Sequence, residues 1–263
     1  MAFTTIEVSA AGNAGTITLN RPEKLNPLSA VTLRELAEAA RWLDGQPEVK
    51  VVVVAGKGRA FSAGADVSVF AAAAEAGPIA TRRAADAGRI MAEAVEDMSA
   101  ITIARIQGHC IGGGVVLAAA CDLRVAAETT RFSIPEVDLG IPLAWGGIPR
   151  LVREIGPAMT KELVLTCRPF TAEEAQELGF VNRVVAEEQL GEAVDELAAQ
   201  LLRKSSLALA VTKRAVNSAA SEVASTAGAW TDADSLLTAL SDPDSRRAAA
   251  DYLHALGRRA VAD

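Results

Sequence analysis

The chain of 263 residues is 50% hydrophobic and 22% charged, which is enough apolar material for a large packed core and excludes a disordered chain. Its 26 basic and 33 acidic residues give a net charge of −7, which disfavours general binding to nucleic acid or to an anionic membrane. The N-terminus lacks a secretory signal pattern, and no apolar run approaches the roughly 20 residues of a membrane span. Three cysteines without a C-x-x-C pair favour a reducing compartment. We therefore expect a cytoplasmic protein without disulfide bonds or a metal site.

The first half of the chain alternates strand and helix patterns. Residues 3–10 and 15–20 alternate in hydrophobicity around a glycine-bearing turn, which predicts a β-hairpin. Helical spacing then runs over residues 29–44, with Ser29 as the N-cap and Gly45 just past the end. Continuous apolar runs predict strands that are covered on both faces, at 50–56, 101–108 and 121–127.

Helical patterns dominate the rest of the chain. They occupy 79–98, 147–154, 157–166 and 172–178. From about residue 187 the pattern is almost entirely helical, and no convincing strand follows “FVNRVV”. We therefore expect a β/α core over residues 1–200 and a helical C-terminal region over residues 201–263.

Two glycine-bearing turns that follow predicted strands carry the main functional signal. Gly112, Gly113 and Gly114 lead directly into an apolar helical stretch, although glycine costs about 0.5–1 kcal/mol relative to alanine inside a helix. Their spacing fits neither G-x-G-x-x-G nor a Walker motif. The other turn lies within residues 56–70 and has no obvious catalytic side chain. Either the glycines allow close backbone packing, or each turn aims one backbone N–H at a common oxyanion.

Glu136 is the candidate acid–base residue. It follows Pro135 in a segment dominated by aliphatic residues, Trp145 and glycines. Desolvation in such surroundings would raise its pKa and make it a stronger base than a solvated glutamate. The alternative is an ordinary surface carboxylate in a loop.

The order and spacing of these segments resemble those of the enoyl-CoA hydratase/isomerase (crotonase) family. The segments that carry the resemblance are “NRPEKLNPLS”, “AFSAGADV”, “HCIGGGVVLAAACD”, “FSIPEVDLGI” and “TCRPFTAEEAQELGFVNRVV”. The resemblance implies an α/β fold, the crotonase-like spiral of repeated ββα units with a helical C-terminal trimerisation region. It also implies an acyl-CoA substrate in fatty-acid metabolism such as β-oxidation, a homo-oligomer (trimer or hexamer) and no separate cofactor, because coenzyme A is part of the substrate.

The resemblance also assigns roles to individual positions. The oxyanion donors would be the backbone N–H groups of Ala65 and Gly113, and Glu136 would be the acid–base residue. The remaining substrate-binding positions would be Lys24, Leu25, Ala63, Asp66, Val67, Gly112, Val116, Trp145 and Tyr252. Tyr252 matches the aromatic residue of a C-terminal F-x-x-K pattern that reaches a neighbouring subunit's CoA. Ala255 stands in place of the lysine, and Arg258 is positioned to compensate for it.

One departure from the family pattern bears on the reaction. Family hydratases carry a second glutamate three residues after the oxyanion glycine, and Val116 occupies that position here. We therefore expect isomerisation of 3-enoyl-CoA to 2-enoyl-CoA by Glu136 alone. A hydratase with weakened activity and a non-catalytic acyl-CoA-binding protein are the alternatives. Ala144 replaces the aspartate of dienoyl-type isomerases. Asp138 would share a face with Glu136 if both lay on a strand, but we expect it to be a loop carboxylate.

A serine hydrolase is the remaining alternative. “AFSAG” approaches the G-x-S-x-G elbow around Ser62, but Ala60 stands where the first glycine should be. His109 and His254 are the two histidines, and His254 lies in the helical tail, so a catalytic triad is unfavoured.

Overall fold

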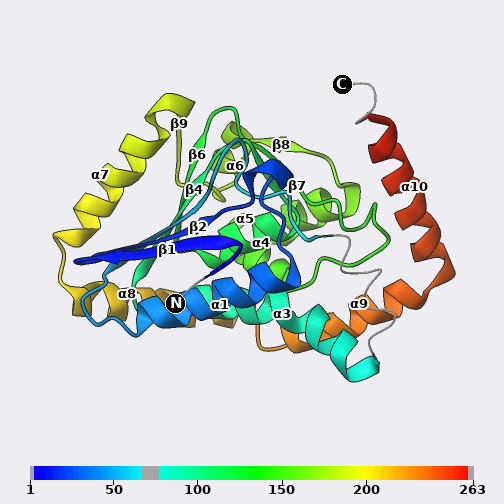
Figure 1. Ribbon diagram of the computed structural model, residues 1–263, viewed down its shortest axis with the longest axis horizontal. Coiled ribbons are helices and arrows are strands. Elements are labelled where there is room, and N and C mark those ends of the chain that lie inside the picture. Colours follow the sequence, from blue (N-terminus) through cyan, green and yellow to red (C-terminus); the bar gives the residue numbers. More distant parts are fainter. Residues whose placement is uncertain (1–2, 67–76, 260–263) are drawn as a thin grey trace.

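The computed structural model describes residues 3–66 and 77–259, except the side chains of 78 and 256–259. It has a mixed α/β fold in which a six-stranded sheet is ordered β1-β2-β3-β4-β6-β9 (Figure 1). β1 and β2 form the predicted antiparallel hairpin, and the other neighbours pair in parallel. The strands are β1 (Ile6–Ala11), β2 (Ala14–Leu19), β3 (Val51–Gly56), β4 (Ile101–Ile106), β6 (Leu123–Ala127) and β9 (Arg183–Val185).

Both faces of this sheet are covered by helices, as the continuous apolar strands predicted. On one face Val51, Ile103 and Val125 pack against α7 (Leu190–Leu202). The opposite face belongs to the main core, to which helices from the first two thirds of the chain contribute. These helices are α1 (Ala30–Asp44), α3 (Pro78–Glu96), α4 (Gly113–Ala120), α5 (Gly147–Thr166) and α6 (Ala172–Glu177). The 3-10 turn η1 (Pro22–Lys24) precedes α1 and has no buried residue.

Local chemistry sets the limits of the helices. Ser29 caps α1 as predicted, because its side chain accepts a hydrogen bond from the Thr32 N–H at 3.2 Å. The two helical patterns expected over 147–154 and 157–166 form one bent helix, α5. The bend lies at Gly156, whose φ of +75° is non-helical, and Pro157 follows it.

A second, three-stranded sheet places the glycine turn beside the glutamate segment. Its strands are β5 (His109–Ile111), β7 (Arg131–Ser133) and β8 (Phe170–Thr171), with β5 and β7 parallel. Phe132 and Phe170 stack at a ring-centroid distance of 5.3 Å and anchor β7 to β8. Because β5 leads into α4 and β7 leads into Glu136, their pairing brings the two segments to the same end of this sheet.

The C-terminal part is helical, as expected from the sequence. It contains η2 (Glu187–Gln189), α7, α8 (Ser206–Val223), η3 (Ala229–Thr231), α9 (Asp232–Ser241) and α10 (Pro243–Arg259). α9 packs against α3, and α10 follows it along the right edge of Figure 1. The predicted boundary at residue 200 falls close to the end of α7 and stays a prediction.

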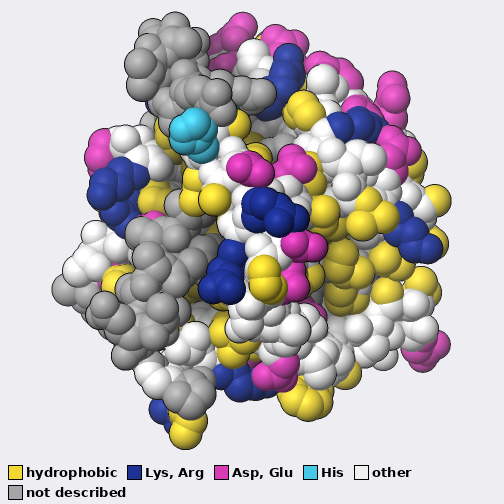
Figure 2. Space-filling model, turned by 90° about the vertical axis from the view of Figure 1, so that its right-hand side faces the viewer, with side chains coloured by type: hydrophobic (Ala, Val, Ile, Leu, Met, Phe, Trp, Pro, Cys, Tyr) yellow, Lys and Arg dark blue, Asp and Glu magenta, His cyan; other side chains and the backbone are white. Residues whose placement is uncertain are grey.

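Acidic and basic side chains are mixed on the face that lies at the right of Figure 1. Figure 2 shows that acidic and basic side chains of its described residues lie close together among hydrophobic ones. None of the helices in the described part of the chain could span a lipid bilayer.

Candidate active site

The two glycine-bearing turns meet, as the sequence predicted. The N–H of Ser62 donates to the carbonyl of His109, and the N–H of Ile111 donates to the carbonyl of Ser62, both at 3.0 Å. Gly64 has a φ of +86°, and a Cβ added there would lie 2.6 Å from the Ile111 carbonyl oxygen and 3.4 Å from the Gly113 nitrogen. The turn after β3 therefore contacts the start of α4, and only glycine fits at this contact.

Each turn presents one backbone donor. Ala65 follows Gly64, and Gly113 is the first residue of α4. Neither N–H donates to an acceptor within residues 3–66 and 77–259. The first N–H groups of a helix have no intrahelical acceptor, and the helix dipole gives that end a partial positive charge. Two such donors from adjacent turns can stabilise a single oxyanion.

Asn26 holds the first turn in place, a role that the sequence patterns did not reveal. Its buried side chain donates to the carbonyls of Lys57 and Ala60, both at 2.9 Å. The neighbouring Leu25 carbonyl accepts the Ala63 N–H at 2.8 Å. A left-handed φ of +54° at Asn26, a residue type that tolerates this region, is the local feature that permits the arrangement.

Ser62 is a structural residue, so the serine hydrolase interpretation is wrong. Its side chain is fully buried, and its hydroxyl donates to the Asn26 carbonyl at 2.8 Å. The same oxygen accepts the Gly64 N–H at 3.1 Å. Since the hydroxyl is engaged within the turn, it positions the backbone and is not available as a nucleophile.

The carboxylate of Glu136 is buried beside the second turn. A Cβ on Gly112 would lie 2.4 Å from its Oε1, so glycine is required for this approach, and the φ of Gly112 is +48°. Its Oε2 is buried and has no hydrogen-bond partner among the described residues. Desolvation raises the pKa of Glu136 from an ordinary 4.5 to about 7. A carboxylate with this pKa can both accept and return a proton near neutral pH.

Glu136 faces a small, otherwise apolar cavity of about 30 Å³, called the glutamate cavity below. It is lined by Ala65, Gly113, Val116, Glu136, Ile141, Pro142, Leu143, Ala144, Trp145 and Leu236. Glu136 is the single ionisable side chain among these described residues. Val116 is buried and packs so close to α5 that a Cβ on Gly147 would lie 2.9 Å from its Cγ2. The position at which family hydratases carry their second glutamate thus presents the methyl groups of Val116 to the cavity.

The other predicted positions lie around this cavity at different distances. Lys24 is exposed on η1, and Leu25 is half-buried in the loop that follows. Asp66 does not line the glutamate cavity and instead contributes to a separate apolar cavity between α1, α3 and α9. Tyr252 is half-buried on α10 and lines neither cavity, whereas Val67 lies outside the described residues.

Asp138 and Arg258 are two further positions for which the sequence makes a prediction. Residues 135–140 form consecutive turns after β7, so Asp138 is a loop carboxylate, as expected, and does not share a strand face with Glu136. Asp138 is exposed in these turns, because the chain bends at Pro135 instead of continuing the strand. The side chain of Arg258 lies outside the described residues.

Trp145 is fixed between two helices. Its backbone has a φ of +64°, which is unusual for a bulky residue. A Cβ on Gly88 of α3 would lie 2.0 Å from its ring atom Cδ2, and a Cβ on Gly113 would lie 2.4 Å from its Cζ3. A side chain at position 88 or 113 would therefore collide with the indole, so both positions require glycine.

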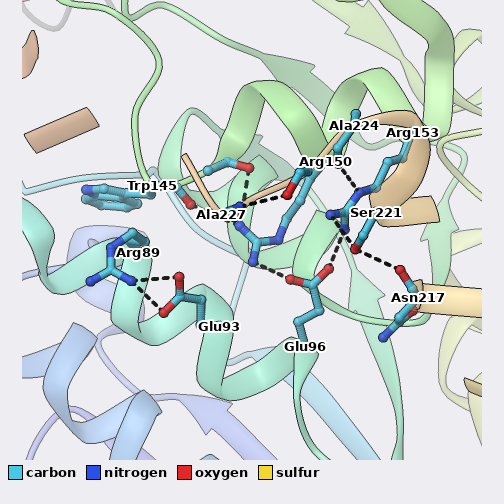
Figure 3. A network of polar contacts seen from close by, with 12 residues as sticks. Arg89, Glu93, Glu96, Trp145, Arg150, Arg153, Asn217, Ser221, Ala224 and Ala227 are labelled. Carbon is cyan, nitrogen blue, oxygen red and sulfur yellow. Dashed lines mark hydrogen bonds and ion pairs between the residues drawn. The ribbon is translucent and has the colours of Figure 1, made fainter. Parts of the chain in front are cut away.

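Arg150 anchors the Trp145 backbone, and sequence patterns did not single it out. Its buried guanidinium donates to the carbonyls of Trp145 and Gly146 at 3.1 and 3.2 Å. Its second terminal nitrogen, Nη2, pairs with Glu96 of α3 at 2.5 Å, and Figure 3 shows the guanidinium between these partners. Asp232 of α9 accepts the Gly146 N–H at 2.8 Å. Contacts from two distant helices thus hold this strained loop.

Comparison with known proteins agrees with this architecture. The sequence model described as enoyl-CoA hydratase/isomerase matches residues 10–255. The crotonyl-CoA hydratase of Syntrophomonas wolfei is 34% identical over 218 residues, covering 82% of this chain and 83% of that protein. The short-chain-enoyl-CoA hydratase of Clostridium acetobutylicum is 33% identical over 218 residues, covering 82% of both.

Solved structures share the fold as well. The crystal structure of an enoyl-CoA hydratase/isomerase from Mycobacterium paratuberculosis matches with a TM-score of 0.87 at 26% identity, covering 95% of this chain and 100% of that one. Ala65, Gly113 and Glu136 line the same cavity, and neither backbone N–H of Ala65 and Gly113 donates to an acceptor within the described residues. With a family model that spans nearly the whole chain, these findings show that the protein belongs to the enoyl-CoA hydratase/isomerase family and has the crotonase fold.

Proposed function

We propose that this enzyme moves the double bond of an enoyl-CoA thioester from the 3,4 to the 2,3 position, with Glu136 as its single acid–base residue. The observation that carries the proposal is the composition of the glutamate cavity. Val116 occupies the place of a second carboxylate, and Glu136 is the one ionisable side chain among the described lining residues. One carboxylate is sufficient for an isomerisation, since the proton that leaves one carbon can return to another.

The first step removes a proton from C2 of the substrate. The thioester oxygen accepts hydrogen bonds from the N–H groups of Ala65 and Gly113, which stabilise the negative charge that develops on it. The Glu136 carboxylate takes the C2 proton, and the electron pair delocalises over the oxygen and C4. In other enzymes the loss of one oxyanion donor lowers the rate by about 10²–10³.

The second step returns the proton. Protonated Glu136 donates to C4, the electrons of the dienolate form the bond between C2 and C3, and the carboxylate is regenerated. No water is consumed and no group leaves, so the atoms balance within the substrate. The raised pKa of Glu136, about 7, suits both steps, because its two protonation states differ little in free energy near neutral pH.

Hydration of a 2-enoyl-CoA is the second candidate function. The relatives named crotonyl-CoA hydratase and short-chain-enoyl-CoA hydratase favour it. Glu136 would then have to orient a water molecule and also supply the proton without help from position 116. An apolar valine cannot accept or donate a hydrogen bond, so water would be held on one side only.

The test compares the two reactions in one preparation. The enzyme is incubated separately with 3-hexenoyl-CoA and 2-hexenoyl-CoA, and the products are separated by liquid chromatography and weighed by mass spectrometry. We expect 2-hexenoyl-CoA from the first substrate and slow or absent hydration of the second. Rapid formation of the 3-hydroxyacyl thioester from 2-hexenoyl-CoA, with no isomerisation, would establish the second candidate instead. Tight binding of both thioesters without turnover would indicate a non-catalytic binding protein.

Val116→Glu sharpens this test, because it restores the missing carboxylate. We expect the variant to gain hydration activity and to lose part of its isomerisation activity. An unchanged product ratio would show that position 116 does not face the reacting carbons.

We also propose that the enzyme acts as a homo-oligomer. Support comes from α8, where Leu207, Val211, Val216 and Val223 are exposed large hydrophobic residues. Leu207 and Val211 lie one turn apart and share a face of α8, and an exposed apolar patch of this kind supports association between copies. Light scattering coupled to gel filtration gives the mass directly, and a monomer at micromolar concentration would contradict this proposal.

A further inference from the structure

Trp145 separates the glutamate cavity from a second cavity. The second one, called the helix cavity, has a volume of about 50 Å³ and lies between α1, α3 and α9. Ala65, Trp145 and Leu236 line both cavities, so they form the partition. Most of the other described walls of the helix cavity are aliphatic, such as Leu33, Ala85 and Leu240. Hydrocarbon is therefore the chemistry that this space would accept.

The partition is rigid at Trp145. Its indole is seated against Gly88 on one side and Gly113 on the other, and its backbone is held by Arg150. A rotation of the ring about its side-chain bonds would bring it against α3 or α4. The backbone of Trp145 cannot shift freely either, because Arg150 donates to its carbonyl (Figure 3). Trp145 therefore acts as a fixed wall of the glutamate cavity and not as a movable lid.

The position of the thioester determines what meets this wall. With the thioester oxygen at the N–H groups of Ala65 and Gly113 and C2 near Glu136, the acyl chain extends inside the glutamate cavity. The ring of Trp145 covers Gly113 and lines the same cavity, so the carbons beyond the reacting ones meet the indole. We propose that Trp145 is the residue that determines chain-length specificity, and that it restricts the substrate to short-chain enoyl-CoA thioesters.

Removal of the indole should join the two cavities. A longer acyl chain could then enter the helix cavity, where each methylene that leaves water improves the affinity about fourfold. This inference rests on the proposed function only in that the cavity receives an acyl-CoA thioester. It is therefore tested by binding, which does not require turnover.

The experiment measures the dissociation constants of butanoyl-CoA and octanoyl-CoA by calorimetry for the wild type, Trp145→Ala and Trp145→Leu. These saturated thioesters cannot react, so the result is independent of whether the enzyme isomerises, hydrates or does neither. We expect the wild type to prefer butanoyl-CoA. In Trp145→Ala the affinity for octanoyl-CoA should rise tenfold or more while that for butanoyl-CoA changes less than threefold, and Trp145→Leu, which keeps apolar bulk and guards against misfolding, should shift in the same direction.

Two variants control this experiment. Trp230→Leu removes an exposed indole that lines neither cavity, and it should leave both dissociation constants unchanged. Ala85→Leu combined with Trp145→Ala refills the helix cavity from α3, and it should abolish the gain for octanoyl-CoA.

Two results would overturn the inference. One is a wild type that binds octanoyl-CoA as tightly as butanoyl-CoA, with no change in either Trp145 variant. The other is a gain in Trp145→Ala that persists after the helix cavity is refilled, since the chain would then follow another path. A shift in binding accompanied by no isomerisation would instead support the inference and contradict the proposed function alone.

Discussion

The two ends of α4 differ in whether their polar groups have hydrogen-bond partners. At the N-terminal end the Gly113 N–H has no acceptor within the described residues, and the Glu136 Oε2 beside it is buried without a partner. At the C-terminal end the buried Arg124 guanidinium donates to the carbonyl of Cys121 at 2.7 Å and pairs with Glu154 at 2.7 Å. Buried polar groups are normally satisfied, so a concentration of unsatisfied ones marks the end of the helix at which a ligand completes the structure.

The paired end also shows what stabilises the helix. A cation near the last carbonyls of a helix is favourable, because those carbonyls lack intrahelical donors and carry a partial negative charge. Arg124 satisfies this role and also donates to the Phe180 carbonyl, so it connects α4 to the chain after α6. The contacts of Arg124 thus stabilise the C-terminal end of α4, while the Gly113 N–H at the N-terminal end stays available to a ligand.

The largest effect should follow removal of the Glu136 carboxylate. Glu136→Gln keeps the shape of the side chain but cannot carry a proton between two carbons, so isomerisation should fall by about 10³-fold. Initial rates with 3-hexenoyl-CoA measure this change. Binding of butanoyl-CoA serves as the control and should stay within a few fold of the wild type. Retention of most of the activity would show that another group moves the proton.

Next in size is the loss of pairing at the other end. Arg124→Met should destabilise the fold by about 3–5 kcal/mol, because it leaves the Cys121 and Phe180 carbonyls and the Glu154 carboxylate without their donor. Urea unfolding followed by circular dichroism gives the free energy. The folded fraction should keep the isomerisation rate of the wild type, and a stability within about 1 kcal/mol of the wild type would argue against this role for Arg124.

A third difference should appear in the pH dependence of stability. The folded state holds the Glu136 proton more tightly than the unfolded state, since its pKa is raised from 4.5 to about 7. The wild type should therefore lose stability as the pH rises from about 4.5 to above 7. Glu136→Gln lacks this loss, so it should be more stable than the wild type by about 3 kcal/mol at pH 8, relative to their difference at pH 4. Urea titrations at the two pH values measure it, and a difference that does not change with pH would mean that the carboxylate is solvated.

The smallest effect concerns a partly redundant pair near the C-terminal end of α4. Lys213 of α8 donates to the Ala100 carbonyl at 3.0 Å and pairs with Asp122 at 2.8 Å. Asp122 keeps two other donors, the N–H and hydroxyl of Thr102, at 2.7 and 2.9 Å. Lys213→Met should therefore cost about 1–2 kcal/mol, less than Arg124→Met. Thermal unfolding measures the two variants side by side, and we expect the melting temperature of Lys213→Met to be the higher one. A lower melting temperature for Lys213→Met than for Arg124→Met would contradict this account of the pairing.

Sequence patterns anticipated the local elements and the chemistry that depends on them. The hairpin, the Ser29 cap and the contact between the two glycine turns are confirmed, because each depends on residues close in the chain or on the shared edge of parallel strands. Of the two interpretations of Glu136 that its aliphatic surroundings left open, the desolvated carboxylate agrees with its buried Oε2.

What the patterns missed depends on contacts between distant segments. The anchor of Trp145 joins Arg150 to Glu96, which lies 54 residues earlier, and it needs the glycine at position 88. No periodicity in a single sequence encodes such a pair. The loop position of Asp138 was predicted correctly, since the chain turns at Pro135.

The pH dependence of kcat/KM for 3-hexenoyl-CoA tests the central claim most directly, because it reports the ionisation of the acid–base residue in the free enzyme. If the lone carboxylate in its apolar cavity abstracts the C2 proton, the value should rise about tenfold per pH unit at low pH and level off near pH 7. An inflection near 4.5, or a profile that Glu136→Gln leaves unchanged, would contradict the account.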